Sequence, residues 1–549
     1  MRRRGRSPRA PRRGPAGGRA LVGAFRGLGT AAIGVLLWPA LTVPFVPAGR
    51  AALADAVVHQ HRLVVDTLVL ALVTALAGTI GGALTAGVHH HFRFRGRGLL
   101  HLMLLSPLLL PPVAPAIALL ELWGHNGFAT RLLDWRSVPV YGFTGLVIAE
   151  VMTLLPLAHL VTLVGLSNLD GSLTDQARDM GASEARILAR IVLPGMRGAL
   201  AGVFLLLVAH ATVDIANPLA LGGSYPVLST RLREAAAGEG DMTAAGAYGL
   251  ILLVICALAA LAMPGRGHRP SQERLRRRRR VPPTGVRDRA LVAAAWALAA
   301  VEALPLVVCA AASVLAGVDS PRPTGRHYAE LLTSGTARLA AADSLLVAAA
   351  AVVASTGIAL AAVAVAPRAG SASISRVLLA SSTPILPLAL GALHWWRAPE
   401  RGTTPGWAAL GLVATIMTIG SAPMMIVLLR QRLAAMTPSA AESAAGLAVR
   451  VRHVIRPLVV PHLAPVVPAM LVVALAVAVN APSPVILFGG ADTPFLATCI
   501  ITDVEAGQLG RASALATTTA ALLGLLGGCV TVLVAPPQRP AVPDDGGPT

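Results

Sequence analysis

Two carboxylates stand inside stretches of the sequence that are otherwise apolar. Glu150 and Asp214 each lie in a hydrophobic run about long enough to cross a bilayer. A charged group at that depth costs roughly 2.5–3.5 kcal/mol unless it faces water or a partner. Because a passing cation would satisfy such groups, one interpretation places them in a translocation path, together with Asn217 and Asn480.

A structural interpretation competes with this one. In it, Asp214 and Glu150 pair with His210, His159 or backbone groups where helices meet, and no ligand is involved. The two interpretations have equal weight for Asp214, and the structural one is favoured for Glu150. Asn217 is then expected to shape the end of a span and the turn after it.

Catalytic and metal chemistry have little support in the sequence. His89, His90 and His91 are adjacent, but no second ligand cluster accompanies them, so we interpret them as a loop at the end of a span. The four cysteines have no CxxC spacing and are expected to be core thiols. The chain has no lysine and therefore no GxxxxGK[ST] phosphate-binding loop. We expect no catalytic residue, no metal and no cofactor.

Composition places the chain in a membrane. Of 549 residues 55% are hydrophobic and 13% charged, and the mean hydropathy is +0.69, which is too apolar for a soluble protein of this size. The net charge of +20 would suggest nucleic acid in a soluble protein. Here the arginines gather between apolar runs, as cytoplasmic loops do, so nucleic acid is not expected as a partner. The predicted class is an all-α integral membrane protein.

Twelve apolar runs are long enough to be transmembrane helices. The third contains Pro107, Pro111, Pro112 and Pro115, which predicts a broken helix. The predicted spans are 28–48, 63–88, 99–121, 141–166, 198–218, 245–263, 290–316, 343–366, 376–394, 408–429, 464–479 and 512–535.

Span number and charge predict one topology. Six spans in each half give both halves the same orientation, so they would be parallel repeats. Starting inside, every basic segment then lies on the cytoplasmic face. Residues 1–27 and 536–549 are predicted to be disordered tails, both cytoplasmic, at a bacterial plasma membrane. The repeats would be 28–264 and 290–535, joined by an arginine-rich linker at 265–289 that can touch anionic lipid.

A polar segment between two apolar runs occurs twice. Gly222-Gly223 recurs as Gly489-Gly490, and Leu193-Pro194 recurs as Val460-Pro461, with the same interval in both cases. A shared interval along such a length of chain indicates two copies of one module. The two polar segments are 167–196 and 431–463.

Each segment carries signals for a short capped helix. Ser172 with Asp175, and Ser439 with Glu442, have the spacing of a capping box. In the first copy Gly181 would end the helix in a left-handed cap. Ser183-Glu184 would then begin a second short helix, and Pro194 suits the first turn of the next span. The expected product is a helix–turn–helix that stands off the membrane and fits a docking partner.

These residues resemble the signature loop of permease subunits in binding-protein-dependent ABC importers. That loop reads Glu-Ala-Ala, three residues, Gly, nine residues, Ile-x-Leu-Pro. The second copy departs from it at Ser443, Ala448 and Pro457. The first copy has Asp for Glu and Gln176 for the first Ala. The positions that align with the signature are Asp175, Ala177, Gly181, Ile191, Leu193 and Pro194 in the first copy, and Glu442, Ala444, Ala448 and Pro461 in the second.

The resemblance implies a transport pathway driven by a partner. In such proteins each loop is a cytoplasmic coupling helix seated in an ATPase subunit, so two loops imply two ATPase copies. An extracytoplasmic solute-binding protein would deliver the cargo. The fused layout and the stretch from Asp214 to Gly223 look most like ferric-iron-type permeases. Permeases for thiamine, polyamines and aminoethylphosphonate are the alternatives.

A twelve-helix secondary transporter is the remaining alternative of another class. It also has parallel halves, but it needs no capped helical segment before the fifth span of each half. Transport without ATP would distinguish it. A membrane-embedded enzyme would need acid, base or metal ligands gathered at one depth, and the histidines here are scattered.

Overall fold

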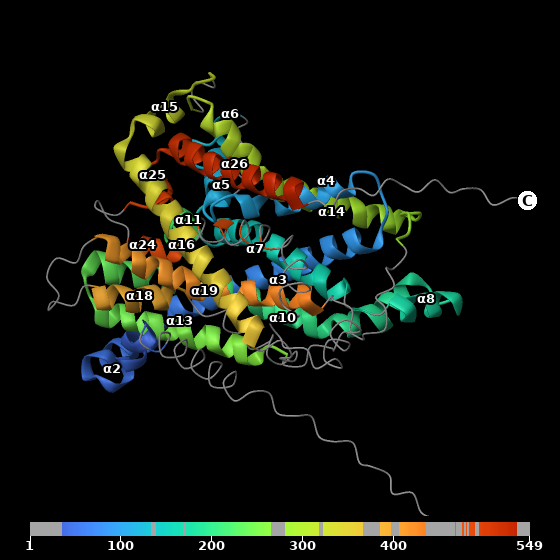
Figure 1. The fold of residues 1–549 in the computed structure, drawn as a ribbon, viewed down its shortest axis with the longest axis horizontal. Coiled ribbons are helices and arrows are strands. Elements are labelled where there is room, and N and C mark those ends of the chain that lie inside the picture. The colour runs from blue at the N-terminus through green and yellow to red at the C-terminus, as the bar shows by residue number, and fades with distance from the viewer. Residues whose placement is uncertain are drawn as a thin grey trace, which may run out of the picture.

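The fold is a bundle of helices, seen in a computed structural model (Figure 1). The model describes residues 36–132, 139–167, 171–264, 280–317, 322–365, 385–396, 406–434, 482–488 and 494–534, together with isolated residues elsewhere. Regular structure in these ranges is helical, apart from two isolated bridges that join Phe92 to Val281 and Leu315 to Pro323. The predicted all-α class is therefore confirmed for the described residues.

Seven helices of the described ranges are long and apolar enough to cross a membrane, and two bent helix pairs raise this number to as many as nine. The bent pairs are Leu36–Phe45 with Pro47–His59, at 86°, and Arg97–Leu109 with Ala114–Arg131, at 100°. The seven are α3 (His61–His91), α7 (Phe143–Ser167), η4 (Leu188–Val192) continued by α10 (Leu193–Val213), α13 (Met242–Ala262), α14 (Val286–Ser313), α16 (Gly335–Val365) and α26 (Leu509–Val534).

Nine of the predicted spans thus have a counterpart among these seven helices and two bent pairs. The second bend falls at Pro111 and Pro112, which confirms the predicted break in the third span. Span 408–429 lies within α19 (Gly406–Ala434), and α18 (Ile385–Trp396) covers the end of span 376–394. Most of span 464–479 and the start of 376–394 lie outside the described residues, as do 1–27, 536–549 and most of the linker 265–289.

Short helices connect the long ones. In chain order the first of them are η1 (Val43–Phe45), α2 (Pro47–Ala54), η2 (Asp55–His59), α4 (Arg97–Leu105), η3 (Ser106–Leu109), α5 (Ala114–Trp123), α6 (Phe128–Leu132), α8 (Gly171–Asp179) and α9 (Glu184–Ile187). They continue with α11 (Ala216–Leu221), α12 (Leu228–Arg233), η5 (Glu234–Glu239), α15 (Arg326–Thr333), α24 (Pro482–Phe488) and α25 (Leu496–Glu505). In Figure 1, α8 stands at one end of the bundle and α2, α15 and α25 lie toward the other.

Small residues bring α3 and α7 into close contact. A Cβ on Gly82 would lie 2.5 Å from the Cβ of Ala158, and one on Gly81 would lie 2.8 Å from Leu155. In lipid, where apolar side chains gain little by leaving the solvent, such close approach of backbones is a main source of helix association. The opposite face of α3 exposes a stripe of large apolar side chains, as lipid contact requires: Val65, Val69, Leu72, Leu76 and Ile80.

The first helix of each half packs on the other half. α14 contacts α3, α4 and α5, where Ala295 and Ala299 join a core with Val88 and Leu104. At the other side, a Cβ on Gly391 of α18 would lie 1.5 Å from the carbonyl oxygen of Leu36. The two halves are therefore interlocked.

Helices recur at nearly the predicted interval. α13 begins at Met242 and α26 at Leu509, and the interval between these starts equals that between Gly222 and Gly489. α11 begins at Ala216 and α24 at Pro482, an interval that is one residue shorter than the interval between Met242 and Leu509. The helix order before each long final helix is thus the same in both halves for the described residues.

Candidate functional site

The chain reverses direction between α8 and α9, and we call residues 171–187 the α8–α9 hairpin. Gly181 has a φ of +78°. The N–H of Ala182 donates to the carbonyl oxygen of Ala177 at 2.9 Å, and the N–H of Gly181 donates to that of Arg178 at 2.8 Å. These two bonds form a Schellman motif, in which a residue without a Cβ is favoured at the left-handed position. The predicted left-handed cap at Gly181 is confirmed.

The start of α8 differs from the prediction. The helix begins at Gly171, so Ser172 lies inside it rather than at its cap, and Asp175 pairs with Arg178 at 2.9 Å. The helix therefore begins two residues earlier than the capping-box spacing predicts. The second helix begins as predicted, because the carbonyl oxygen of Ser183 accepts the N–H of Ile187 at 3.0 Å.

Arg178 holds the two helices of the hairpin together. Its guanidinium donates to both carboxylate oxygens of Glu184 on α9, and also to Asp175 on its own helix. Hydrogen bonding to Glu184 raises the pKa of Arg178 above its ordinary value, so the guanidinium stays charged. All three side chains are at least a quarter exposed, which limits each pair to roughly 0–1 kcal/mol of stability.

Apolar contacts fix the hairpin to the bundle. Ala177, Ile187 and Val192 are buried in one cluster with Leu166 and Met196, and Ile191 packs against that cluster. Of the other predicted positions, Pro194 lies in the first turn of α10 as expected, and both Leu193 and Pro194 are exposed. Leu173, Met180 and Leu188 also expose apolar side chains here. An exposed apolar surface on a well-anchored hairpin suits contact with another protein.

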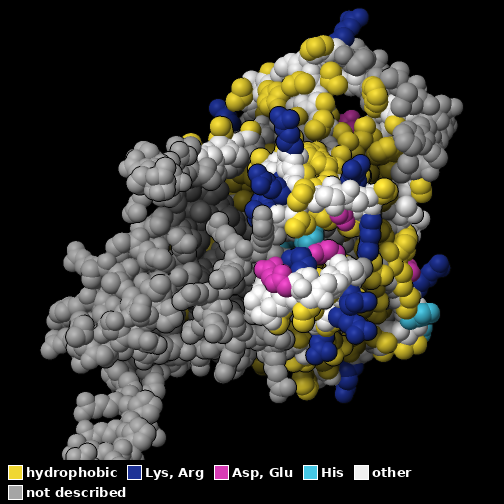
Figure 2. Space-filling view, turned by 90° about the vertical axis from the view of Figure 1, so that its right-hand side faces the viewer, with side chains coloured by type: hydrophobic (Ala, Val, Ile, Leu, Met, Phe, Trp, Pro, Cys, Tyr) yellow, Lys and Arg dark blue, Asp and Glu magenta, His cyan; other side chains and the backbone are white. Residues whose placement is uncertain are grey.

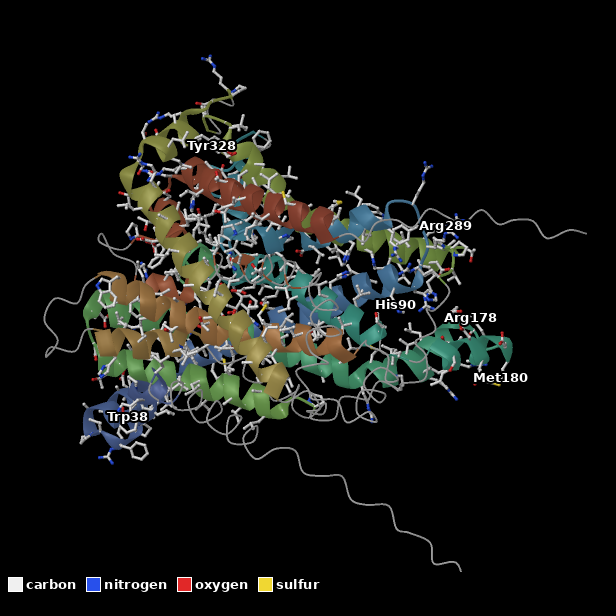
Figure 3. All side chains as sticks on the ribbon, viewed as in Figure 1. Trp38, His90, Arg178, Met180, Arg289 and Tyr328 are labelled. Atoms are coloured by element: carbon white, nitrogen blue, oxygen red, sulfur yellow. The ribbon has the colours of Figure 1, made fainter. Side chains whose placement is uncertain are left out.

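Three basic segments meet at this end of the bundle. His91 lies 3.7 Å from Glu184, and the N–H of Arg93 donates to the carbonyl oxygen of Val281 at 2.8 Å. Figure 2 shows arginine side chains gathered on this face, and Figure 3 places Arg178, Met180, His90 and Arg289 together, far from Trp38 and Tyr328. A largely apolar cavity of about 250 Å³ lies between these segments, lined by side chains that include Leu84, Val88, Glu184, Leu188, Met196 and Arg287.

The interpretation of His89, His90 and His91 as a loop was wrong. They form the last turn of α3, and the chain turns later, where Gly96 has a φ of +81°. The helix continues because the buried His89 stacks on His101, with ring centres 4.6 Å apart. Within the described residues no group of three histidine, cysteine, aspartate or glutamate side chains could hold a metal ion.

A second group of candidate residues lies where α10 gives way to α11. α10 ends at Val213, and the Asp214 side chain accepts the backbone N–H of Asn217 at 3.1 Å. The Asn217 amide nitrogen donates to Thr153 Oγ1 of α7 at 3.2 Å. These bonds tie the unwound junction after α10 to α7. We call Glu150, Thr153, Asp214 and Asn217 the carboxyl site.

Glu150 completes the carboxyl site from α7. Its side chain is 1% exposed and lies within electrostatic range of Asp214 and Asn217. Its carboxyl group lies beside the side chains of Asp214 and Asn217, and the amide oxygen of Asn217 has no hydrogen-bond partner among the described residues. The proposed structural partner His159 instead bonds to His101 and Thr85, at 3.1 and 3.0 Å. The site therefore gathers two carboxyl groups and one unpartnered amide oxygen.

Several predicted positions lie outside the described residues, and other site residues were not predicted. Outside are Asn480, Glu442, Ala444, Ala448 and Pro461. Thr153, Arg178 and Glu184 were missed as site residues. The i, i+3 spacing of Asp175 and Arg178 was a readable signal for a helix-surface pair. Thr153 carried no such signal, because its partner is 64 residues away.

Comparison with known proteins identifies the type of this fold. Residues 78–264, which include both the hairpin and the carboxyl site, match the family of binding-protein-dependent transport system inner membrane components. The described part of the chain also has seven helices that are long and apolar enough to cross a membrane, which together with this match indicates a multi-pass membrane protein.

Relatives of this chain differ in the cargo that their names give. It is 26% identical to a ferric transport system permease of Actinobacillus pleuropneumoniae over 36% of this chain and 30% of that one. It is 29% identical to a spermidine/putrescine permease of Haemophilus influenzae over 31% of this chain and 62% of that one. A probable ABC transporter permease of Sinorhizobium fredii is 27% identical over 78% of this chain and 83% of its own length. The match to each of the first two thus spans less than two thirds of that relative.

Proposed function

We propose that this chain is the membrane-spanning permease of an ABC importer, with the α8–α9 hairpin as the element that couples it to a separate cytoplasmic ATPase. The observation that carries the proposal is the anchored hairpin with exposed apolar residues at one end of the bundle. Its buried side rests on Leu166 and Met196, at the ends of two long helices. A force on the hairpin would therefore reach both helices as a rigid unit.

Two features support a fused, pseudo-dimeric permease. The interval between Met242 and Leu509 matches that of the sequence repeat, and the relative from Sinorhizobium fredii aligns with most of the chain. In this proposal the segment 431–463 is a second coupling loop, and two ATPase copies bind. The hairpin face and both termini are cytoplasmic, the membrane is the bacterial plasma membrane, and a solute-binding protein delivers cargo at the opposite face.

The proposed cargo is a cation, with ferric iron first and a polyamine second. Relatives named for ferric and for spermidine/putrescine transport support this class. The carboxyl site supports it independently, because a cation would offset the charge of two neighbouring buried carboxyl groups and bind the unpartnered amide oxygen of Asn217.

Photo-crosslinking from two equally exposed positions tests the coupling role. Met180 on the hairpin and Phe45 at the far end are both 82% exposed. A crosslinking amino acid at Met180 in the full chain, expressed in its native membrane, should capture a protein that mass spectrometry identifies as an ABC ATPase. The same group at Phe45 should not. Capture of the ATPase from Phe45 alone, or from neither position, contradicts the proposal.

Energy dependence separates this function from secondary transport. Uptake of radiolabelled cargo into right-side-out vesicles should require ATP on the hairpin side. Uptake driven by an ion gradient without ATP would instead favour the twelve-helix secondary transporter.

A further inference from the structure

The apolar cavity beside the α8–α9 hairpin has no part in the proposed function. It has a volume of about 250 Å³ and lies where α3 and α7 end and where α10 and α14 begin. These four helices are long and apolar enough to cross a membrane, so their ends mark the boundary between hydrocarbon and head groups. The aliphatic side chains that line the cavity include Leu84, Val88, Leu166, Leu188, Leu200 and Leu291.

The rim of this cavity carries an excess of positive charge. The cavity is lined by parts of two basic segments, 89–98 and 280–289, which pair where the Arg93 N–H donates to the carbonyl oxygen of Val281. Asp288 is the single acidic residue of the two segments. Their arginines are Arg93, Arg95, Arg97, Arg280, Arg287 and Arg289. No carboxylate of the described residues forms an ion pair with any of these arginines, so an anionic group at the rim would be stabilised.

The acid that lines the cavity from the hairpin is already paired. Glu184 accepts hydrogen bonds from Arg178 through both of its oxygens and lies 3.7 Å from His91. Its charge is therefore offset locally and does not repel an incoming anion. Asp288 lies between Arg287 and Arg289 in the sequence, so the rim stays positive around it.

An anionic phospholipid matches both parts of this site. Its acyl chain suits the apolar interior, its phosphate suits the basic rim, and the bilayer supplies it at this depth. The chain's own linker segment 265–279 is a poorer occupant, because Leu275 is its single large apolar residue. A peptide from a partner protein would bring backbone polar groups into a cavity that has few groups to pair with them.

We propose that one acyl chain of an anionic phospholipid, from the leaflet on the hairpin side, occupies this cavity while its phosphate contacts Arg287. The bound lipid then touches the hairpin through Ile187 and Leu188, α3 through Leu84, and α14 through Leu291. The inference depends on the cavity and its charge, and not on the coupling role of the hairpin.

Native mass spectrometry of the purified full chain in detergent tests the site. Dioleoyl-phosphatidylglycerol, dioleoyl-phosphatidylcholine and oleate are the probes, because they separate the charge of the head group from the acyl chain. Wild type should retain one phosphatidylglycerol, with a Kd about tenfold lower than that for phosphatidylcholine. Equal retention of the two phospholipids overturns the anionic head group, and tighter binding of oleate than of phosphatidylglycerol overturns a phospholipid as the occupant.

Gly87→Leu fills the cavity from within α3. Gly87 lines the cavity, and a Cβ there would have no heavy atom within 4 Å, so the new side chain has room. Gly202→Leu is the matched control, because Gly202 lies in α10 with equally open surroundings and does not line the cavity. Retention of phosphatidylglycerol should fall at least tenfold in Gly87→Leu and stay unchanged in Gly202→Leu. Unchanged retention in Gly87→Leu, as expected if a segment of the chain itself filled the cavity, overturns the proposal.

Arg287→Gln tests the head-group contact. The Kd for phosphatidylglycerol should rise about fivefold, and that for phosphatidylcholine should stay the same. Arg50→Gln on α2, toward the other end of the bundle, is the control, since Arg50 is exposed as Arg287 is. Unchanged phosphatidylglycerol binding in Arg287→Gln overturns the contact. Because lipid retention is measured without an ATPase, a failed Met180 crosslink leaves this proposal standing, and failed lipid retention leaves the coupling proposal standing.

Discussion

The α8–α9 hairpin comes from one short stretch and stands at the surface, whereas the carboxyl site joins residues 64 positions apart and is enclosed. In the hairpin the side-chain hydrogen bonds of Arg178 all reach residues within six positions, and Glu184 also lies 3.7 Å from His91 of α3. In the carboxyl site the buried amide oxygen of Asn217 has no hydrogen-bond partner among the described residues. A surface contact site can pair its polar groups internally and still be recognised by a partner protein. A site in a transport pathway whose polar groups were all paired internally would have none left to bind a cargo.

The largest expected effect comes from Gly181→Val. A β-branched residue at a φ of +78° costs about 1–2 kcal/mol, and that strain falls entirely on the hairpin turn. Uptake should drop at least tenfold, while the melting temperature of the whole chain changes little. Gly240→Val is the control, since Gly240 has a φ of +72° and equally open surroundings before α13. Equal loss of uptake in both variants would show that the hairpin turn has no special role in uptake.

Glu150→Gln should separate function from stability. The amide keeps the shape of the side chain and removes a buried carboxyl group, so the free energy of unfolding at neutral pH should stay the same or rise by about 1–2 kcal/mol. Uptake should fall severalfold to tenfold, because one acceptor for the cargo becomes a donor. Both quantities can be measured on the same purified chain, by thermal melting and in proteoliposomes. A variant with lower stability and full uptake would show that Glu150 is structural.

Thr153→Val tests how the Asn217 amide is oriented. Loss of the Thr153 hydroxyl removes a hydrogen bond worth about 1 kcal/mol and frees the amide to turn. Uptake should fall about threefold to fivefold. Thr162→Val is the control on the same helix, because its hydroxyl is buried without a partner and its removal should cost nothing. If both variants behave alike, Thr153 does not position Asn217.

Arg178→Lys should have the smallest effect. Lysine keeps the charge but cannot bond to both oxygens of Glu184, so the hairpin is held more loosely. Uptake should decrease about twofold, and more at high salt, which screens the remaining point charge. Arg186→Lys on α9 should leave uptake unchanged at every salt concentration. A salt-independent defect in Arg178→Lys would argue against an electrostatic role.

The sequence predicted the hairpin better than the carboxyl site, for a physical reason. A left-handed cap and a helix start depend on neighbouring residues, so Gly181, Ser183 and Pro194 could be assigned from spacing alone. The error at Ser172 was a shift of the helix start. Glu150 and Asp214 were found as charges in apolar runs, but their approach to each other depends on how α7 packs against the end of α10. The stacking of His89 on His101 likewise comes from tertiary contact, and it overrode the predicted loop.

The close contact between Leu36 and Gly391 has a consequence for synthesis. The backbone at position 36 fits against a residue that leaves the ribosome only after all of the chain between them has been made. At about 5–20 residues per second that delay is roughly 20–70 s. During that time the first helix has no permanent neighbour at this surface, so the nascent chain must wait in lipid, or be held by an insertion factor, until its second half arrives to close the molecule.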